Sequence, residues 1–151
     1  MTPVIRSVLS VVGAFFVVAV LVGLATAGAS AVMLPGGGAQ PEPTTAFLIV
    51  NIVYSVAIAV VGGYVAATVS DHSPLGHAAG LAVFMMALGL ASWLWVNGGE
   101  PAPGQPAWYP VVMSLVVPPV AVLGGVLVTR RQRAKTYFSR QAREAADTPD
   151  R

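Results

Sequence analysis

The chain has 151 residues, of which 56% are hydrophobic and only 9% are charged. Soluble domains carry about a quarter charged residues, so this composition excludes an ordinary soluble protein and indicates a membrane protein. The absence of cysteine excludes disulfides, thiolate metal sites and cysteine nucleophiles.

The first predicted span covers residues 7–34, which is longer than the roughly 20 residues that cross a bilayer. Small residues recur at every fourth position, at Ala19, Gly23, Ala27 and Ala31. Such stripes let helix backbones approach closely in membranes, so we expect this face to pack against another helix. A second interpretation stays open, because an apolar stretch ending in small residues is also typical of a cleavable signal peptide.

The second predicted span covers residues 46–70 and contains no charged residue. Its small side chains again lie four residues apart, at Ser55, Ala59, Gly63 and Ala67. This spacing predicts a second face for close helix packing.

Segments rich in glycine and proline separate the spans. Residues 35–45 and 97–106 are predicted loops, because neither helix nor strand persists through such a composition. Thr44 or Thr45 is placed to cap the second span. A short turn then leads to the third span, with Pro74 at its first helical position.

The third predicted span covers residues 75–96 and the fourth covers residues 107–128. Pro118 and Pro119 lie near the middle of the fourth span. Proline cannot donate the helical hydrogen bond, so we expect a bend there. Gly125 is expected to provide a further packing position on this span.

Basic residues follow the fourth span, in a tail that covers residues 130–151 and whose polar end we expect to fray. A membrane surface offers about 1 kcal/mol for each basic residue beside it, so the tail is predicted to anchor on anionic lipids. The residues concerned are Arg130, Arg131, Arg133 and Lys135.

The distribution of charge predicts the orientation. All eight lysines and arginines lie at Arg6 or from Arg130 onward, whereas the two predicted loops carry only Glu42 and Glu100. The positive-inside rule therefore places both termini in the cytoplasm. Because the cations lie beside a span, lipid is favoured over nucleic acid as their partner.

An internal repeat is a further hypothesis. Shifting the chain by 62 residues aligns residues 59–63, AVVGG, with residues 121–125, AVLGG. An even number of spans separates the two hairpins, so the copies would run in the same direction, as a 2+2 parallel repeat. The competing interpretation is shared composition in a chain rich in Ala, Val and Gly.

The four spans contain no Asp, Glu, Lys or Arg in their interiors. Proton-coupled carriers normally need such a group, and small multidrug resistance transporters, which have a similar size, carry an essential Glu in their first helix. The first span here has only serine, threonine and small or apolar residues. We therefore exclude that family and expect no enzyme activity and no cofactor.

Three polar side chains of the second span, Asn51, Tyr54 and Ser55, share one helix face. Ser92 and Ser114 are candidates to reach them from other helices. One interpretation is a ligand site or a water-lined constriction, and the other is hydrogen bonding between helices.

Asp71, His72 and His77 cluster near the turn between the second and third spans. Aspartate and histidine are zinc ligands, but this spacing does not place them on one helix face, and a fourth ligand is missing nearby. We therefore predict no metal site.

The sequence GGYVAA at residues 62–67, followed by Pro74, Leu75, His77 and Ala78, resembles small bacterial membrane proteins of four helices without an assigned activity. The resemblance implies a location in the bacterial inner membrane. It transfers no catalytic or binding residue.

Together these features predict an all-α, integral membrane four-helix bundle, with a transmembrane domain at residues 1–129 and a cytoplasmic tail at residues 130–151. The expected function is that of an accessory or scaffold subunit, which packs against membrane partners or copies of itself. The alternative is a transporter or channel component with a polar spot near Asn51 and Tyr54 and a hinge at Pro118-Pro119.

Overall fold

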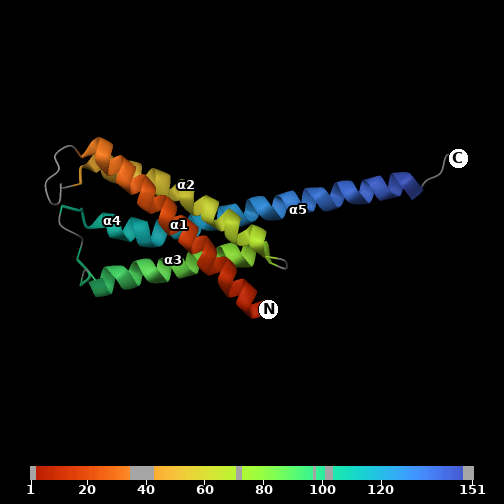
Figure 1. The fold of residues 1–151 in the computed structure, drawn as a ribbon, viewed down its shortest axis with the longest axis horizontal. Coiled ribbons are helices and arrows are strands. Elements are labelled where there is room, and N and C mark those ends of the chain that lie inside the picture. The colour runs from red at the N-terminus through yellow and green to blue at the C-terminus, as the bar shows by residue number, and fades with distance from the viewer. Residues whose placement is uncertain (1–2, 35–42, 71–72, 97, 101–103, 148–151) are drawn as a thin grey trace.

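The computed structural model describes residues 3–34, 43–70, 73–96, 98–100 and 104–147. These residues form four helical rods that are long and apolar enough to cross a membrane, which confirms the all-α four-helix bundle (Figure 1). The first three rods are α1 (Pro3–Met33), α2 (Thr45–Val69) and α3 (Pro74–Val96). The fourth consists of α4 (Trp108–Val111), the π-helix η1 (Val112–Val116) and α5 (Val117–Asp147).

The rods alternate in direction. α1 begins, α2 ends and α5 leaves the bundle at one end, which we call the tail end (Figure 1). α2 and α4 begin at the opposite end, which we call the loop end. Both described ends of the chain therefore lie on the same side of the bundle, as an even number of crossings requires.

The closest helix contact lies between α2 and α5. A Cβ atom on Gly63 would overlap the backbone carbonyl of Ala121, and one on Gly124 would overlap the backbone at Val60. Ala59 and Ala121 are fully buried in the same contact region. Small residues thus bring the two backbones together, which is how helices associate where lipid is as apolar as their side chains.

The start of α2 is formed by a side-chain cap. The backbone N–H of Phe47 donates to Thr44 Oγ1 at 3.2 Å, as expected for one of the two predicted capping residues. Pro74 is the first residue of α3, also as predicted.

A π-helix precedes the prolines of the fourth rod, at which the sequence predicts a bend. The π-helix η1 directly precedes them, and the N–H of Val117 donates to the carbonyl of Val112, five residues earlier. Pro118 and Pro119 follow Val117, where the rod returns from the wide turn to α-helical bonding. A local wide turn therefore accompanies the two prolines in the fourth rod.

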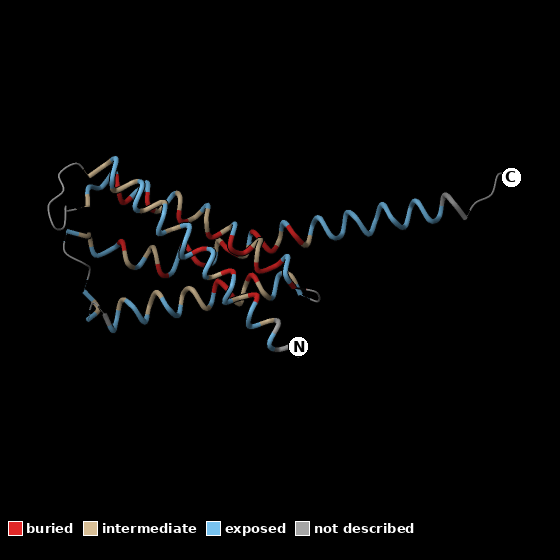
Figure 2. The backbone as a smooth tube through the Cα atoms, in the orientation of Figure 1, coloured by how far each residue is buried: buried red, intermediate tan, exposed pale blue. Residues whose placement is uncertain are grey.

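The basic tail continues α5 as a helix to Asp147, so the expectation of a frayed end is wrong up to that residue. The cause is local composition, since residues 126–147 contain no Gly or Pro and many Ala, Arg, Gln and Lys, which favour helix. Residues 130–144 are exposed, and the helix projects from the bundle (Figure 2). The predicted boundary at residue 129 falls inside this continuous helix.

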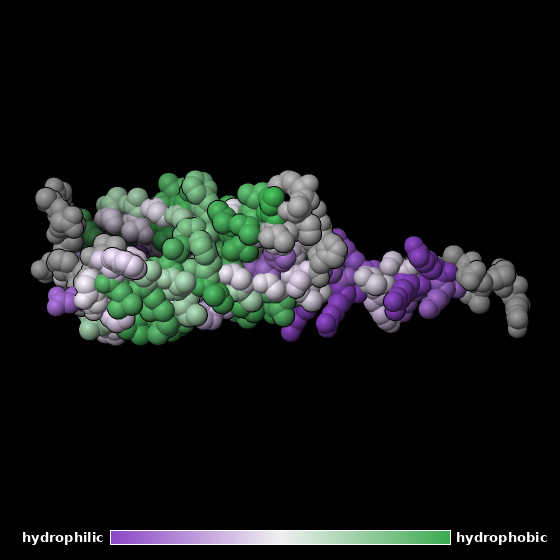
Figure 3. Space-filling view, turned by 90° about the horizontal axis from the view of Figure 1, so that it is seen from below, coloured by the Kyte–Doolittle hydropathy of each residue, from purple (hydrophilic) through white to green (hydrophobic). Residues whose placement is uncertain are grey.

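The hydrophobic and hydrophilic parts of the surface meet where α5 leaves the bundle. In the space-filling view the bundle is largely covered by hydrophobic side chains, whereas hydrophilic side chains cover the projecting part of α5 (Figure 3). The exposed apolar side chains of the bundle suit contact with lipid. The chain is therefore a multi-pass membrane protein.

Candidate functional site

A cluster of polar side chains lies inside the bundle toward the loop end. We call it the polar cluster, and its members are Thr26 of α1, Asn51, Tyr54 and Ser55 of α2, and Tyr109 of α4.

Asn51 is the centre of the polar cluster. Its Nδ2 donates to the hydroxyl of Tyr54, while its Oδ1 accepts from the hydroxyl of Tyr109 at 2.8 Å and from Ser55 Oγ at 3.4 Å. The hydroxyls of Tyr54 and Thr26 lie 2.7 Å apart. Asn51 and Ser55 are buried, so these bonds satisfy groups that lipid would leave unpaired.

The structure brings the three predicted residues of this spot together but gives them different partners. Ser92 is exposed on α3, and Ser114 is buried with its Oγ near Gly89. Thr26 and Tyr109 bond to Tyr54 and Asn51 in place of the expected Ser92 and Ser114. Nothing in the sequence pattern singles out Thr26 or Tyr109 as members of this cluster.

The side chains of the polar cluster are suited to joining helices and not to catalysis. Its members are hydroxyls and one amide, and none of these groups is a general base at neutral pH. The hydrogen bonds join α1, α2 and α4 near the loop end. The arrangement fits hydrogen bonding between helices better than an open polar path.

An apolar recess of about 320 Å³, open to the surface of the bundle, lies beside Ser55. Phe15, Met85 and Met113 contribute to its wall, and Pro118 lies at its edge. Ser55 already donates to Asn51, so the recess offers little to a polar solute. It suits a hydrocarbon group.

The predicted packing positions on α2 and α5 are buried. Ser55, Ala59 and Ala67 have at most 2% of their surface exposed, and Gly63 is buried against α5. A Cβ atom on Gly125 would lie 2.6 Å from the Cβ of Ala78 on α3.

The stripe on α1 behaves differently from the expectation that it packs inside the bundle. Ala19, Gly23 and Ala27 are exposed, and an ideal Cβ on Gly23 has nothing within 4 Å. α1 packs on the bundle through Ala14 and Val18 instead. Both faces of a transmembrane helix are apolar, so the small-residue pattern could not tell which face turns inward.

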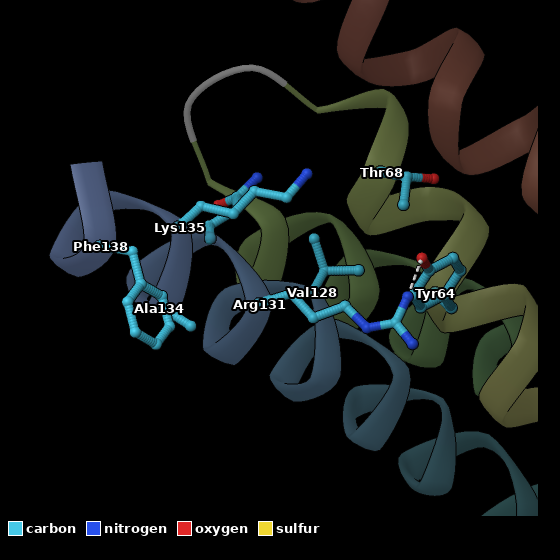
Figure 4. A pocket seen from close by; sticks show the side chains of 8 residues that line it. Tyr64, Thr68, Val128, Arg131, Ala134, Lys135 and Phe138 are labelled. Carbon is cyan, nitrogen blue, oxygen red and sulfur yellow. Dashed lines mark hydrogen bonds between the residues drawn. The ribbon is translucent and has the colours of Figure 1, made fainter. Parts of the chain in front are cut away.

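A groove at the tail end joins α2 to α5 (Figure 4). Arg131 extends from α5 to Tyr64 of α2, where its Nη1 donates to the tyrosine hydroxyl at 3.0 Å and its Cζ lies 5.6 Å from the ring centroid. The groove has a volume of about 490 Å³. We call it the basic groove, and its lining residues are Tyr64, Thr68, Val128, Arg131, Gln132, Ala134, Lys135 and Phe138.

The four residues predicted to anchor lipid therefore point in different directions. Arg131 and Lys135 line the basic groove. Arg133 lies along another surface of the helix, beside Thr136, and Arg130 lines neither of these two surfaces.

The histidine and aspartate candidates near the α2–α3 turn form no described cluster. Asp71 and His72 lie outside the described residues. His77 Nδ1 lies 2.9 Å from the backbone carbonyl of Ser73. Within the described ranges no three His, Asp or Glu side chains gather in a way that could hold a metal ion.

No protein-family model, curated protein or solved structure matches the chain. The function of the chain is therefore inferred from the geometry of its described residues.

Proposed function

We propose that this protein is a non-enzymatic assembly subunit of the bacterial inner membrane, which binds another transmembrane helix through the outer face of α1. The observation that carries the proposal is the exposure of Ala19, Gly23 and Ala27. A backbone with so little side-chain cover permits the close helix approach that stabilises contacts in lipid. An ideal Cβ on Gly23 has nothing within 4 Å in the described monomer, so this part of the face is uncovered.

The alternative, a transporter or channel component, has less support. The polar atoms around Asn51 and Tyr54 are already hydrogen-bonded to one another. The recess beside Ser55 is mainly apolar. A path for a polar solute would need unpaired groups along its length.

A substitution at Gly23 tests whether a partner helix binds this face of α1. Gly23→Ile adds a branched side chain where nothing in the monomer lies within 4 Å, so the monomer should fold normally. The same side chain would separate two docked backbones. We expect the wild type to be isolated from its native membrane in mild detergent as a complex, with a partner or with copies of itself, and Gly23→Ile to be isolated alone.

Gly28→Ile is the matched control. Gly28 also has nothing within 4 Å, but five residues at 100° each place it about 140° around the helix from Gly23. It should leave the complex intact. A wild-type protein that is isolated as a monodisperse monomer would contradict the proposal, and so would equal loss of the complex in both variants.

A further inference from the structure

We propose that the basic groove between α2 and α5 is a binding site for the phosphate group of an anionic phospholipid. This inference concerns the opposite end of the bundle from the polar cluster and does not depend on the α1 interface. It is narrower than general attraction of the tail to a charged surface, because it assigns the lipid to one face of α5.

The groove lies where a headgroup would meet the protein. α2 ends at Val69, one residue beyond Thr68, and α5 leaves the bundle at the same level. Its volume of about 490 Å³ falls within the range of roughly 300–1,000 Å³ that is usual for ligand sites. Basic recesses between transmembrane helices at the cytoplasmic surface are suited to lipid headgroups.

The polar side chains of the groove offer donors to a phosphate. Arg131 and Lys135 both extend from α5 toward α2 (Figure 4). Tyr64 accepts a hydrogen bond from Arg131, so its own proton is available for an incoming oxygen. The guanidinium retains further N–H groups, which suit the geometry of phosphate oxygens. None of the lining residues is acidic.

Contact with Tyr64 holds Arg131 in place before any ligand arrives. The hydrogen bond and the position of the guanidinium over the ring both fix this side chain against α2. An arginine restrained in this way loses less conformational freedom on binding than one extended into water. Val128 lies on the bundle side of Arg131 and gives the groove an apolar wall there, which suits the glycerol and acyl end of a lipid (Figure 4).

The test measures lipid retained by the purified full-length protein in native mass spectrometry. Phosphatidylglycerol, phosphatidylcholine and inorganic phosphate are offered separately, and inorganic phosphate is also used as a competitor. We expect phosphatidylglycerol to be retained in preference to phosphatidylcholine, and free phosphate not to displace it. Equal retention of the two lipids would overturn the proposal, and displacement by phosphate would overturn the assignment to lipid.

Two double variants with the same net charge distinguish lipid binding in the basic groove from general attraction of lipid to the charged tail. Arg131→Gln with Lys135→Gln removes both groove cations and should weaken phosphatidylglycerol binding about 25-fold, at about fivefold for each charge. Arg130→Gln with Arg133→Gln removes two cations outside the groove and should leave binding close to that of the wild type. Equal weakening by the two double variants would overturn the site.

Tyr64→Phe provides a test without any change of charge. It removes the hydroxyl that holds Arg131, so binding should weaken about threefold, which is the effect of one average hydrogen bond in a membrane protein. Unchanged binding in this variant would contradict the positioning role of Tyr64.

Discussion

Asn51 is the residue on which the loop end of the bundle depends most directly. It bonds Tyr109 of the fourth rod and, through Tyr54, connects to Thr26 of α1. An amide in hydrocarbon would leave four hydrogen-bonding sites unsatisfied, so its partners determine whether its burial stabilises the fold.

Replacing Asn51 by leucine should lower the free energy of unfolding by about 2 kcal/mol. The substitution removes three hydrogen bonds, each contributing about 0.6 kcal/mol on average in a membrane protein. Unfolding in mild detergent titrated with SDS measures the change. Ser92→Ala, on the exposed face of α3, should have no effect. A leucine variant as stable as the wild type would show that the polar cluster does not stabilise the bundle.

The sequence identified three of the five residues of the polar cluster. Asn51, Tyr54 and Ser55 share one helix face by spacing alone, so their grouping was predictable. The partners Thr26 and Tyr109 were not, because they depend on the rotation of other helices about their axes. Uniformly apolar helices carry no amphipathic pattern that fixes such a rotation.

At the scale of whole elements, hydropathy and helix-terminus residues predicted the spans closely. The second span was expected at residues 46–70 and α2 covers Thr45–Val69, with Thr44 as its cap. The π-helix η1 was not predicted, since no residue type marks a π turn as clearly as proline marks a bend. It changes the register between α4 and α5, and therefore determines where Tyr109 points.

The relation between η1 and the prolines predicts the outcome of a deletion. Removing Leu115 should let the wide turn close as an ordinary α-helix, in which the rings of Pro118 and Pro119 would clash with the carbonyls four residues earlier, at a cost of about 3 kcal/mol or more. Combining the deletion with Pro118→Ala and Pro119→Ala should recover at least about 2 kcal/mol of that loss, because alanine supplies the missing N–H.

The same SDS titration measures both deletion variants. Leu115 is 45% exposed, so its loss by itself removes little packing. Equal stability of the single deletion and the combined variant would show that the wide turn does not relieve the prolines.

Among the described residues, the basic side chains from Arg130 to Arg143 lie on the projecting part of α5, whereas the surface of the bundle is largely apolar. This asymmetry predicts the orientation, with the tail end in the cytoplasm. The absence of native cysteine makes the orientation measurable with single introduced thiols.

Glu100→Cys near the loop end should react with a membrane-impermeant maleimide in intact cells. Ser139→Cys on the projecting part of α5 should react only after the membrane is permeabilised. Neither substitution changes a lysine or arginine, so the topology signal remains intact. The reverse pattern of labelling would contradict the orientation while leaving the bundle itself unaffected.

α5 continues without a break from the bundle to Asp147, so a movement at its bundle end is enlarged at its far end. From Gly125, where α5 contacts α3, to Asp147 the helix runs 22 residues, or about 33 Å at 1.5 Å per residue. A tilt of about 10° about Gly125 would move the far end of the helix by about 6 Å. A small tilt of α5 among the membrane helices would therefore be amplified at the far end of the described tail, where a probe would register it.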